Sequence, residues 1–242
     1  MASGSIHVAV IGAGALGRVY GVHLETAGAR VTFVVRPEHL GDAGGFAVER
    51  LNGDRTLRES LAPHRTSEIP RSADGILLAV RGEQIDSALI DELRSGPDVP
   101  VVALTPLLPR GQERLGAELG SRVVVGVPTL AAKLDADGVV RYWAFGSSPT
   151  LIEKNDRWRV VLARLAGRFA ASHLGVRLER GVSQKNPATT IAFFPLSVAI
   201  GSAGGVSALC ERHELLRMAG AACRESLELA RRIGRVEPAA VV

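Results

Sequence analysis

Three glycines near the start of the chain, Gly12, Gly14 and Gly17, have the spacing of a dinucleotide-binding loop. In such a loop the first glycine forms a tight turn, the second lets the backbone approach a pyrophosphate, and the third seats a helix against a sheet. The helix that follows points its free amides and positive dipole end at the phosphates. The alternative is a glycine-rich turn that binds nothing. The residues expected to contact the cofactor in this loop are Gly12, Ala13, Gly14, Ala15, Leu16 and Gly17.

A basic residue follows the second apolar run of the chain. Arg36 stands at the end of Arg30–Val35, where NAD-binding proteins of this kind carry an acid that accepts hydrogen bonds from the ribose 2′-hydroxyl. An arginine at this point instead accommodates a 2′-phosphate. The pattern predicts NADP(H) as the cofactor. The other interpretation of Arg36 is a solvated charge at the end of a strand.

Apolar runs of strand length alternate with segments of helical spacing along the first three quarters of the chain. Ile6–Ile11 is apolar except for His7, which is too short for a helix and typical of a buried parallel strand. The alternation predicts an α/β fold with a parallel sheet of the Rossmann type. Further predicted strands include Ile76–Val80, Val101–Leu104, Val123–Val127 and Val176–Leu178, and the predicted helices of this part are Ile85–Leu93, Arg110–Leu119 and Asp156–His173.

The sequence changes character after Arg180. Ala188–Ile200 and Leu215–Ile233 have helical spacing and are apolar over much of their surface. We therefore predict a Rossmann-type domain over residues 1–180 and a short all-helical domain over residues 181–242. Such a short segment cannot bury this much apolar surface alone, so we expect a homodimer through the C-terminal helices.

Composition excludes several classes of function. The net charge of +4 is modest and the arginines are scattered, so the sequence does not favour nucleic-acid binding. No apolar run is long enough to cross a bilayer, and no basic, apolar leader precedes the first strand, so we expect a cytoplasmic protein that is not bound to a membrane. The two cysteines, Cys210 and Cys223, suit a reducing compartment, and neither they nor the histidines have the spacing of metal ligands.

The segment GAGALGRVYGVHLETAG, followed by VTFVVRPEHL, resembles the ketopantoate reductase family. The resemblance continues through ADGILLAVRGEQ and DGVVRYWAFG, and it covers about the first 180 residues well and the rest poorly. It implies a Rossmann domain joined to a helical domain, with the substrate in the cleft. It also implies that hydride passes from NADPH to the carbonyl carbon of a 2-oxo acid while a lysine protonates the oxygen.

Some residues of the family pattern are present and others are replaced. Arg36 matches the arginine that binds the 2′-phosphate, and Gln84 matches the glutamine of a Lys-x-x-Gln segment. The lysine of that segment, which faces the cofactor, is Arg81 here, and arginine keeps the charge but not the geometry of a single ammonium donor. Where the family has Gln-Asn-Gly, this chain has Thr105, Pro106 and a leucine, and Pro106 cannot form the hydrogen bonds of an asparagine side chain.

The catalytic helix of the family is also altered. Its pattern is Lys-x-x-x-Asn-x-x-x-Asn-Pro-Leu-Thr, and alignment places Asn186 at the lysine and Thr190 and Phe194 at the two asparagines. Lys185 comes one position early, which is about 100° of rotation on a helix. Pro187 predicts that the helix begins there, so Lys185 would lie on a lead-in from which it reaches the cleft as the general acid. The resemblance also implies trailing helices that bring a serine and a glutamate to the substrate, and we expect no counterpart to them in residues 1–242.

These replacements remove most of the polar groups that would hold a 2-oxo acid. We therefore predict an NADP(H)-dependent reductase that acts on a carbonyl of an apolar small molecule other than ketopantoate. Two alternatives stay open. The first is a non-redox enzyme, such as a cyclase or isomerase of a biosynthetic pathway, on the same scaffold, and the second is a catalytically inactive NADP-binding protein. The residues expected to line the substrate pocket are Thr105, Pro106, Asn186, Thr190 and Phe194.

Overall fold

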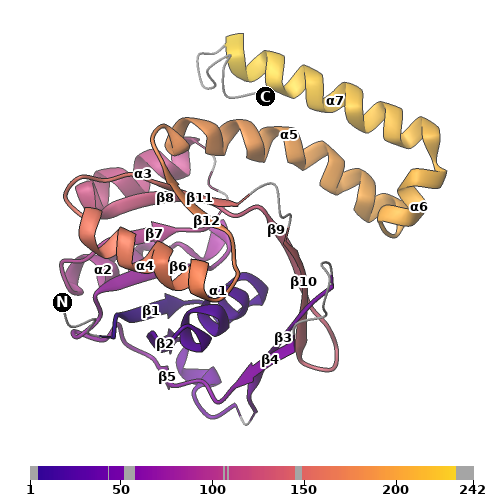
Figure 1. Cartoon of the computed structure of the whole chain (residues 1–242). Coiled ribbons are helices and arrows are strands. Elements are labelled where there is room, and N and C mark those ends of the chain that lie inside the picture. Colours follow the sequence, from indigo (N-terminus) through magenta and orange to yellow (C-terminus); the bar gives the residue numbers. More distant parts are fainter. Residues whose placement is uncertain are drawn as a thin grey trace.

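The structure is a computed structural model that describes residues 5–42, 44–51, 58–105, 107, 109–144 and 149–232. Within these ranges the side chains of residues 58, 109 and 185–193 are not described. Figure 1 shows an α/β unit with a long helical pair across one side. The predicted fold class, a Rossmann-type parallel sheet followed by a short all-helical segment, is confirmed.

The large sheet has the strand order β12-β11-β8-β7-β6-β1-β2-β5. All neighbouring pairs are parallel except β8 and β11, which are antiparallel. Chain order runs outward from β1 in both directions, so the point where it reverses lies at β1. The strands are β1 (His7–Ile11), β2 (Arg30–Val34), β5 (Arg65–Thr66), β6 (Gly75–Leu78), β7 (Val101–Ala103), β8 (Val123–Val127), β11 (Thr150–Glu153) and β12 (Val176–Glu179).

A second, smaller sheet has the order β4-β3-β10-β9. It consists of β3 (Phe46–Arg50), β4 (Arg58–Leu61), β9 (Leu130–Leu134) and β10 (Val139–Ala144). The central pair, β3 and β10, is parallel and joins segments that lie far apart in the sequence. We did not expect β9, because Leu130–Leu134 has no β-branched or aromatic residue and does not alternate clearly between apolar and polar residues.

Helices cover both faces of the large sheet. α1 (Ala15–Thr26) and α4 (Arg159–Ala171) bury their apolar sides in one core, and α2 (Ser87–Ser95) and α3 (Pro109–Leu119) bury theirs in the other. α1 contacts strands of both sheets, so it lies between them, as Figure 1 shows. This arrangement positions the first turn of α1 at the boundary between the two sheets.

Three helices follow the last strand. They are α5 (Val182–Ala203), α6 (Val206–Glu211) and α7 (His213–Arg232). α5 contacts α7 and also β8 and β11 of the large sheet. A small apolar cluster in the helical part includes Ala199, Ala203, Leu209 and Ala219. The helical part of the chain therefore begins at Val182, while the predicted division into domains at residue 180 stays a prediction.

The predicted start of the fifth helix is wrong. α5 begins at Val182, five residues before Pro187, so Lys185 lies within the helix and not on a lead-in to it. The cause is a distant cap: the carboxylate of Glu153, at the end of β11, accepts hydrogen bonds from the backbone amides of Gly181 and Ser183, both at 2.8 Å. The carboxylate oxygens accept hydrogen bonds from amides that have no partner within the helix. The negative charge of the carboxylate also interacts favourably with the helix dipole.

In the part of the chain that the structure describes, no helix combines the length and the apolar character needed to span a bilayer.

We predict that Glu153→Ala lowers the free energy of unfolding by about 1–3 kcal/mol, because it leaves two helix amides without their acceptor. Equilibrium unfolding in urea measures this change. Glu68→Ala is the matched control, since Glu68 is exposed, and it should change the free energy of unfolding by less than about 0.5 kcal/mol. Equal effects of the two substitutions would contradict the capping role of Glu153.

Candidate functional site

The glycine loop connects β1 to α1 and has the geometry that its spacing predicts. Gly12 has a φ of 99°, a conformation that favours glycine, and the amide of Gly12 donates to the carbonyl of Val34 at 3.1 Å. A Cβ atom on Gly17 would lie 1.9 Å from the carbonyl oxygen of Gly12. A Cβ atom on Gly14 would meet no atom within 4 Å. Gly12 and Gly17 therefore shape the loop, whereas Gly14 leaves open space next to it.

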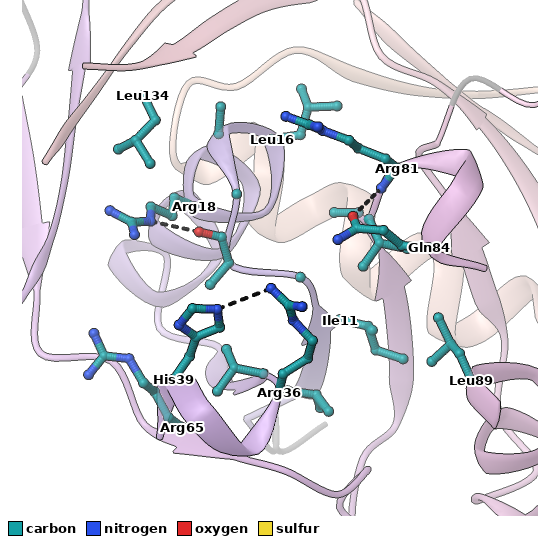
Figure 2. A pocket seen from close by; sticks show the side chains of 18 of the residues that line it. Ile11, Leu16, Arg18, Arg36, His39, Arg65, Arg81, Gln84, Leu89 and Leu134 are labelled. Carbon is teal, nitrogen blue, oxygen red and sulfur yellow. Dashed lines mark hydrogen bonds between the residues drawn. The ribbon is translucent and has the colours of Figure 1, made fainter. Parts of the chain in front are cut away.

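That open space is part of a cavity of about 1080 Å³ (Figure 2). Its walls come from the glycine loop, the ends of β2 and β6, the start of α2, and β9 of the small sheet. The loop lies between the carboxyl ends of β1, β2 and β6, where the chain order of the sheet reverses. In open α/β sheets this is the place where ligands bind. The volume is at the upper end of the range for small-molecule pockets.

Cationic side chains predominate around the cavity. The lining includes the side chains of Arg18, Arg36, Arg65, Arg81 and Lys133. Against these five cations stand three carboxylates, Asp42, Asp86 and Glu92. Burial raises the pKa of the Glu92 carboxyl, and a hydrogen bond from the Ile69 amide at 3.0 Å partly opposes this. The balance of charge favours an anionic ligand.

Arg18 joins the glycine loop to the small sheet. Its Nε donates to the carbonyl oxygen of Ala13 at 2.7 Å, and one Nη donates to that of Gly138, in the β9–β10 turn, at 3.2 Å. Its guanidinium also lies over the ring of Phe46, 4.2 Å from the ring centre. Burial lowers the pKa of Arg18, as does nearby Arg65, while Asp42 opposes them. Arg18 thus fixes the loop relative to the opposite wall.

The predicted cofactor residues converge on the cavity. All of them except Gly17 line it, including Arg36, Arg81 and Gln84. Arg36 follows β2 and is largely exposed, with 68% of its side chain accessible. Gln84 has a structural task as well, because its side-chain oxygen accepts the backbone amide of Arg81 at 2.9 Å and so holds the turn after β6. Their roles toward a cofactor stay predictions.

The predicted substrate residues do not converge in this way. Thr105 is buried, does not line the cavity, and donates its hydroxyl hydrogen to the carbonyl oxygen of Val80 at 2.7 Å. Phe194 projects from α5 with 68% of its surface exposed and does not line the cavity. Pro106 lies outside the described residues, and so do the side chains of Lys185, Asn186 and Thr190 on α5.

Sequence reasoning missed several residues of the cavity wall. Arg18 directly follows the glycine motif but carries no signal of its own. Phe46 and Arg65 come from β3 and β5, and Arg65 lies 4.9 Å from the centre of the Phe46 ring. Lys133 and Leu134 belong to β9, which itself was not predicted. Pairing within the small sheet brings Phe46, Lys133 and Leu134 to the cavity, and the pairing of β5 with β2 in the large sheet brings Arg65 there.

The residues present fit a dinucleotide phosphate. The open space at Gly14 admits a group that approaches the backbone, and the first turn of α1 presents amides to it. No acidic side chain stands in this first turn to oppose an anion. Among the described residues, no group of three or more His, Cys, Asp or Glu side chains could hold a metal ion.

The chain matches the model of the ketopantoate reductase PanE/ApbA family over residues 8–156. Among proteins with a curated description, none matches this chain.

Three solved structures illustrate the likeness in fold. A PanE/ApbA family ketopantoate reductase from Ralstonia eutropha JMP134 is 24% identical, with 96% of this chain and 76% of that chain covered and a TM-score of 0.72. A dimeric ketopantoate reductase from Staphylococcus aureus is 15% identical, with 92% and 76% covered and a TM-score of 0.63. A D-mandelate dehydrogenase in complex with NADH is 16% identical, with 96% and 75% covered and a TM-score of 0.66.

The two glycines of the loop should respond differently to the same substitution. We predict that Gly17→Ala lowers the free energy of unfolding by about 3 kcal/mol or more, because the added methyl group overlaps the carbonyl oxygen of Gly12. Gly14→Ala, with open space around the methyl group and a φ of −75°, should change it by less than about 1 kcal/mol. Urea unfolding of both variants measures the difference, and a stable Gly17→Ala variant would contradict the close approach.

Proposed function

The chain belongs to the ketopantoate reductase family, and on this premise we propose that it is an NADPH-dependent reductase. The cavity at the glycine loop would hold NADPH. The substrate would be a small apolar molecule with a carbonyl group, other than ketopantoate. The observation that carries the proposal is the coincidence of a glycine loop, a helix N-terminus and five cationic side chains around one cavity.

Charge complementarity supports NADPH as the ligand. A dinucleotide phosphate carries a pyrophosphate and a 2′-phosphate, and the cavity offers hydrogen-bond donors for both, namely backbone amides for the first and a guanidinium for the second. Backbone amides of the glycine loop and of α1 face the pyrophosphate position, while Arg36 stands after β2, where the ribose 2′-position lies in this fold. A guanidinium can bind a phosphate through two parallel hydrogen bonds. The end of β2 carries Arg36 and not a carboxylate that would accept a hydrogen bond from a free 2′-hydroxyl.

A reductase also needs a proton donor and a substrate site. When bound, the nicotinamide would supply hydride to the substrate carbon. Lys185, in the first turns of α5, is our candidate for the residue that protonates the carbonyl oxygen. The hydroxyl of Thr105 donates to the backbone carbonyl of Val80, and Leu107 has a buried, apolar side chain, so neither side chain offers a hydrogen bond to a carboxylate. This supports an apolar substrate.

The coenzyme site is tested by calorimetric titration with NADPH and NADH. We expect NADPH to bind more tightly, and Arg36→Glu to weaken NADPH binding about a hundredfold, because a carboxylate then faces the 2′-phosphate. Arg30→Glu is the matched control: Arg30 is exposed at the opposite end of the same strand, so NADPH binding should not change. Gly14→Ala should weaken both nucleotides, since its methyl group enters the cavity. No binding of either nucleotide would contradict the proposal.

The reaction is tested with the same protein by following NADPH oxidation with apolar ketones, aromatic 2-oxo acids and ketopantoate. The aromatic acids are included because a neighbour in fold is named a D-mandelate dehydrogenase. We expect oxidation with an apolar carbonyl compound and little with ketopantoate, and we expect Lys185→Met to lower kcat more than NADPH affinity. NADPH binding without oxidation by any of these compounds would instead favour the non-redox enzyme or the inactive binding protein.

We also propose that the chain forms a homodimer through its C-terminal helices. Large apolar side chains are exposed there, with accessible fractions of 53% to 68% for Phe194, Val198, Val206, Met218 and Leu229. A solved neighbour in fold is a dimeric ketopantoate reductase. Burying such side chains in a symmetric contact would stabilise a dimer.

The dimer is tested by light scattering at micromolar concentration. The wild-type chain should have the mass of a dimer, and Met218→Glu should shift it toward the monomer, because a carboxylate would be buried in the contact. A surface control, Val160→Glu on α4, replaces an equally exposed valine outside these helices and should leave the mass unchanged. A wild-type monomer would contradict the proposal.

A further inference from the structure

Arg36, His39 and Asp42 form a hydrogen-bonded triad of side chains at the edge of the cavity. One Nη of Arg36 donates to Nε2 of His39 at 3.2 Å, as Figure 2 shows. Because a guanidinium can only donate, Nε2 must accept, and the hydrogen of the neutral ring is then on Nδ1. Nδ1 in turn donates to Oδ2 of Asp42 at 3.2 Å. The imidazole is therefore held between a cation and an anion with its lone pair toward Arg36.

Other charged groups surround this triad of side chains. Glu38, on the same short helical turn (Pro37–His39), forms an ion pair with Arg36 at 3.3 Å. Arg65, from β5, donates to the backbone oxygen of Asp42 at 2.8 Å, and Arg18, from α1, is close enough to Asp42 and Arg65 to interact with both charges. The segment that carries His39 and Asp42 is thus tied to β5, and all of these side chains except Glu38 line the cavity.

A phosphate bound by Arg36 changes what the imidazole can do. The phosphate oxygens accept hydrogen bonds and carry about two negative charges, so they draw the Arg36 donors away from Nε2. A neutral ring would then turn its lone pair toward the phosphate, which is unfavourable. A protonated ring would donate from Nε2 to the phosphate and from Nδ1 to Asp42, so both of its hydrogens would have acceptors. Histidine is the side chain that takes up a proton most readily near neutral pH.

We propose that His39 is a second recognition residue for the 2′-phosphate of NADPH, and that it takes up a proton from solvent when the nucleotide binds. Asp42 is the positioning residue that orients the ring and stabilises its positive charge. This inference rests on the proposed NADPH site. Up to one proton enters the complex for each nucleotide whose phosphate reaches the ring, whereas NADH, which has a hydroxyl at this position, draws none.

Proton uptake makes the coenzyme preference depend on pH. Raising the pH opposes protonation of the ring in the complex, so the affinity for NADPH falls. The affinity for NADH does not fall in the same way, because NADH binding takes up no proton. From the linkage relation we expect the ratio of NADPH to NADH affinity to fall about fivefold between pH 7 and pH 8.5. This window lies above the second ionisation of the phosphate itself, which is near pH 6, so the phosphate contributes little.

The test is calorimetric titration with NADPH at pH 7.5 in three buffers that differ in ionisation enthalpy. The dependence of the apparent enthalpy on that quantity gives the number of protons taken up. We expect a clear uptake with NADPH and none with NADH in the wild-type chain. His39→Gln should abolish the uptake and lower the preference for NADPH about tenfold, and Asp42→Asn should reduce both. His213→Gln, which changes an exposed histidine at the start of α7, should change neither.

Two results would overturn the inference, and they are distinguishable. Tight NADPH binding with the same proton uptake in wild type and His39→Gln would refute the role of His39 and leave the NADPH site intact. Failure of the wild-type chain to bind NADPH would refute both the site and this inference. Loss of uptake in His39→Gln, with a folded protein by circular dichroism, would support it.

Discussion

The close approach of Gly17 to the carbonyl of Gly12 is the contact on which the arrangement of this chain depends. It brings the first turn of α1 against the end of β1, so the helix enters the layer between the two sheets. From there α1 presents Arg18 to the turn between β9 and β10 and its free amides to the cavity. A single side-chain atom at this point would separate the helix from the strand and displace the groups that define the cavity.

Much of the sheet and of the phosphate-binding loop could be predicted from the sequence, because the signals are local. The apolar run of Ile6–Ile11, the glycine spacing and the position of Arg36 are all contained in one stretch of chain, and the structure brings Ile11, the loop residues 12–16 and Arg36 to one cavity. The resemblance to the ketopantoate reductase family is confirmed over residues 8–156, where the family model matches. Local patterns carry such information because each segment alone determines its own element.

The rest depends on contacts between distant segments, which a pattern does not record. The start of α5 follows from Glu153, which lies 28 positions before Gly181 and whose carboxylate caps the helix, so Pro187 is a misleading signal for the helix start. The far wall of the cavity depends on β9, whose mixed composition gives no strand signal until β10 pairs with it. Thr105 was expected at a substrate pocket, but its hydroxyl hydrogen goes to the carbonyl of Val80.

The parallel pairing of β3 with β10 bears on the order in which this molecule can assemble. Val139 lies opposite Ala47, so the small sheet can close only after the intervening chain, which includes β6, β7 and β8, has been brought into place. Closing so long a loop costs conformational entropy. Contacts of this kind are therefore formed late, because they stabilise the molecule only after the shorter-range structure exists. We expect the glycine loop, which is built from neighbouring residues, to form before the small sheet that supplies the opposite wall of the cavity. The cavity is therefore a product of the completed fold and not of either sheet alone.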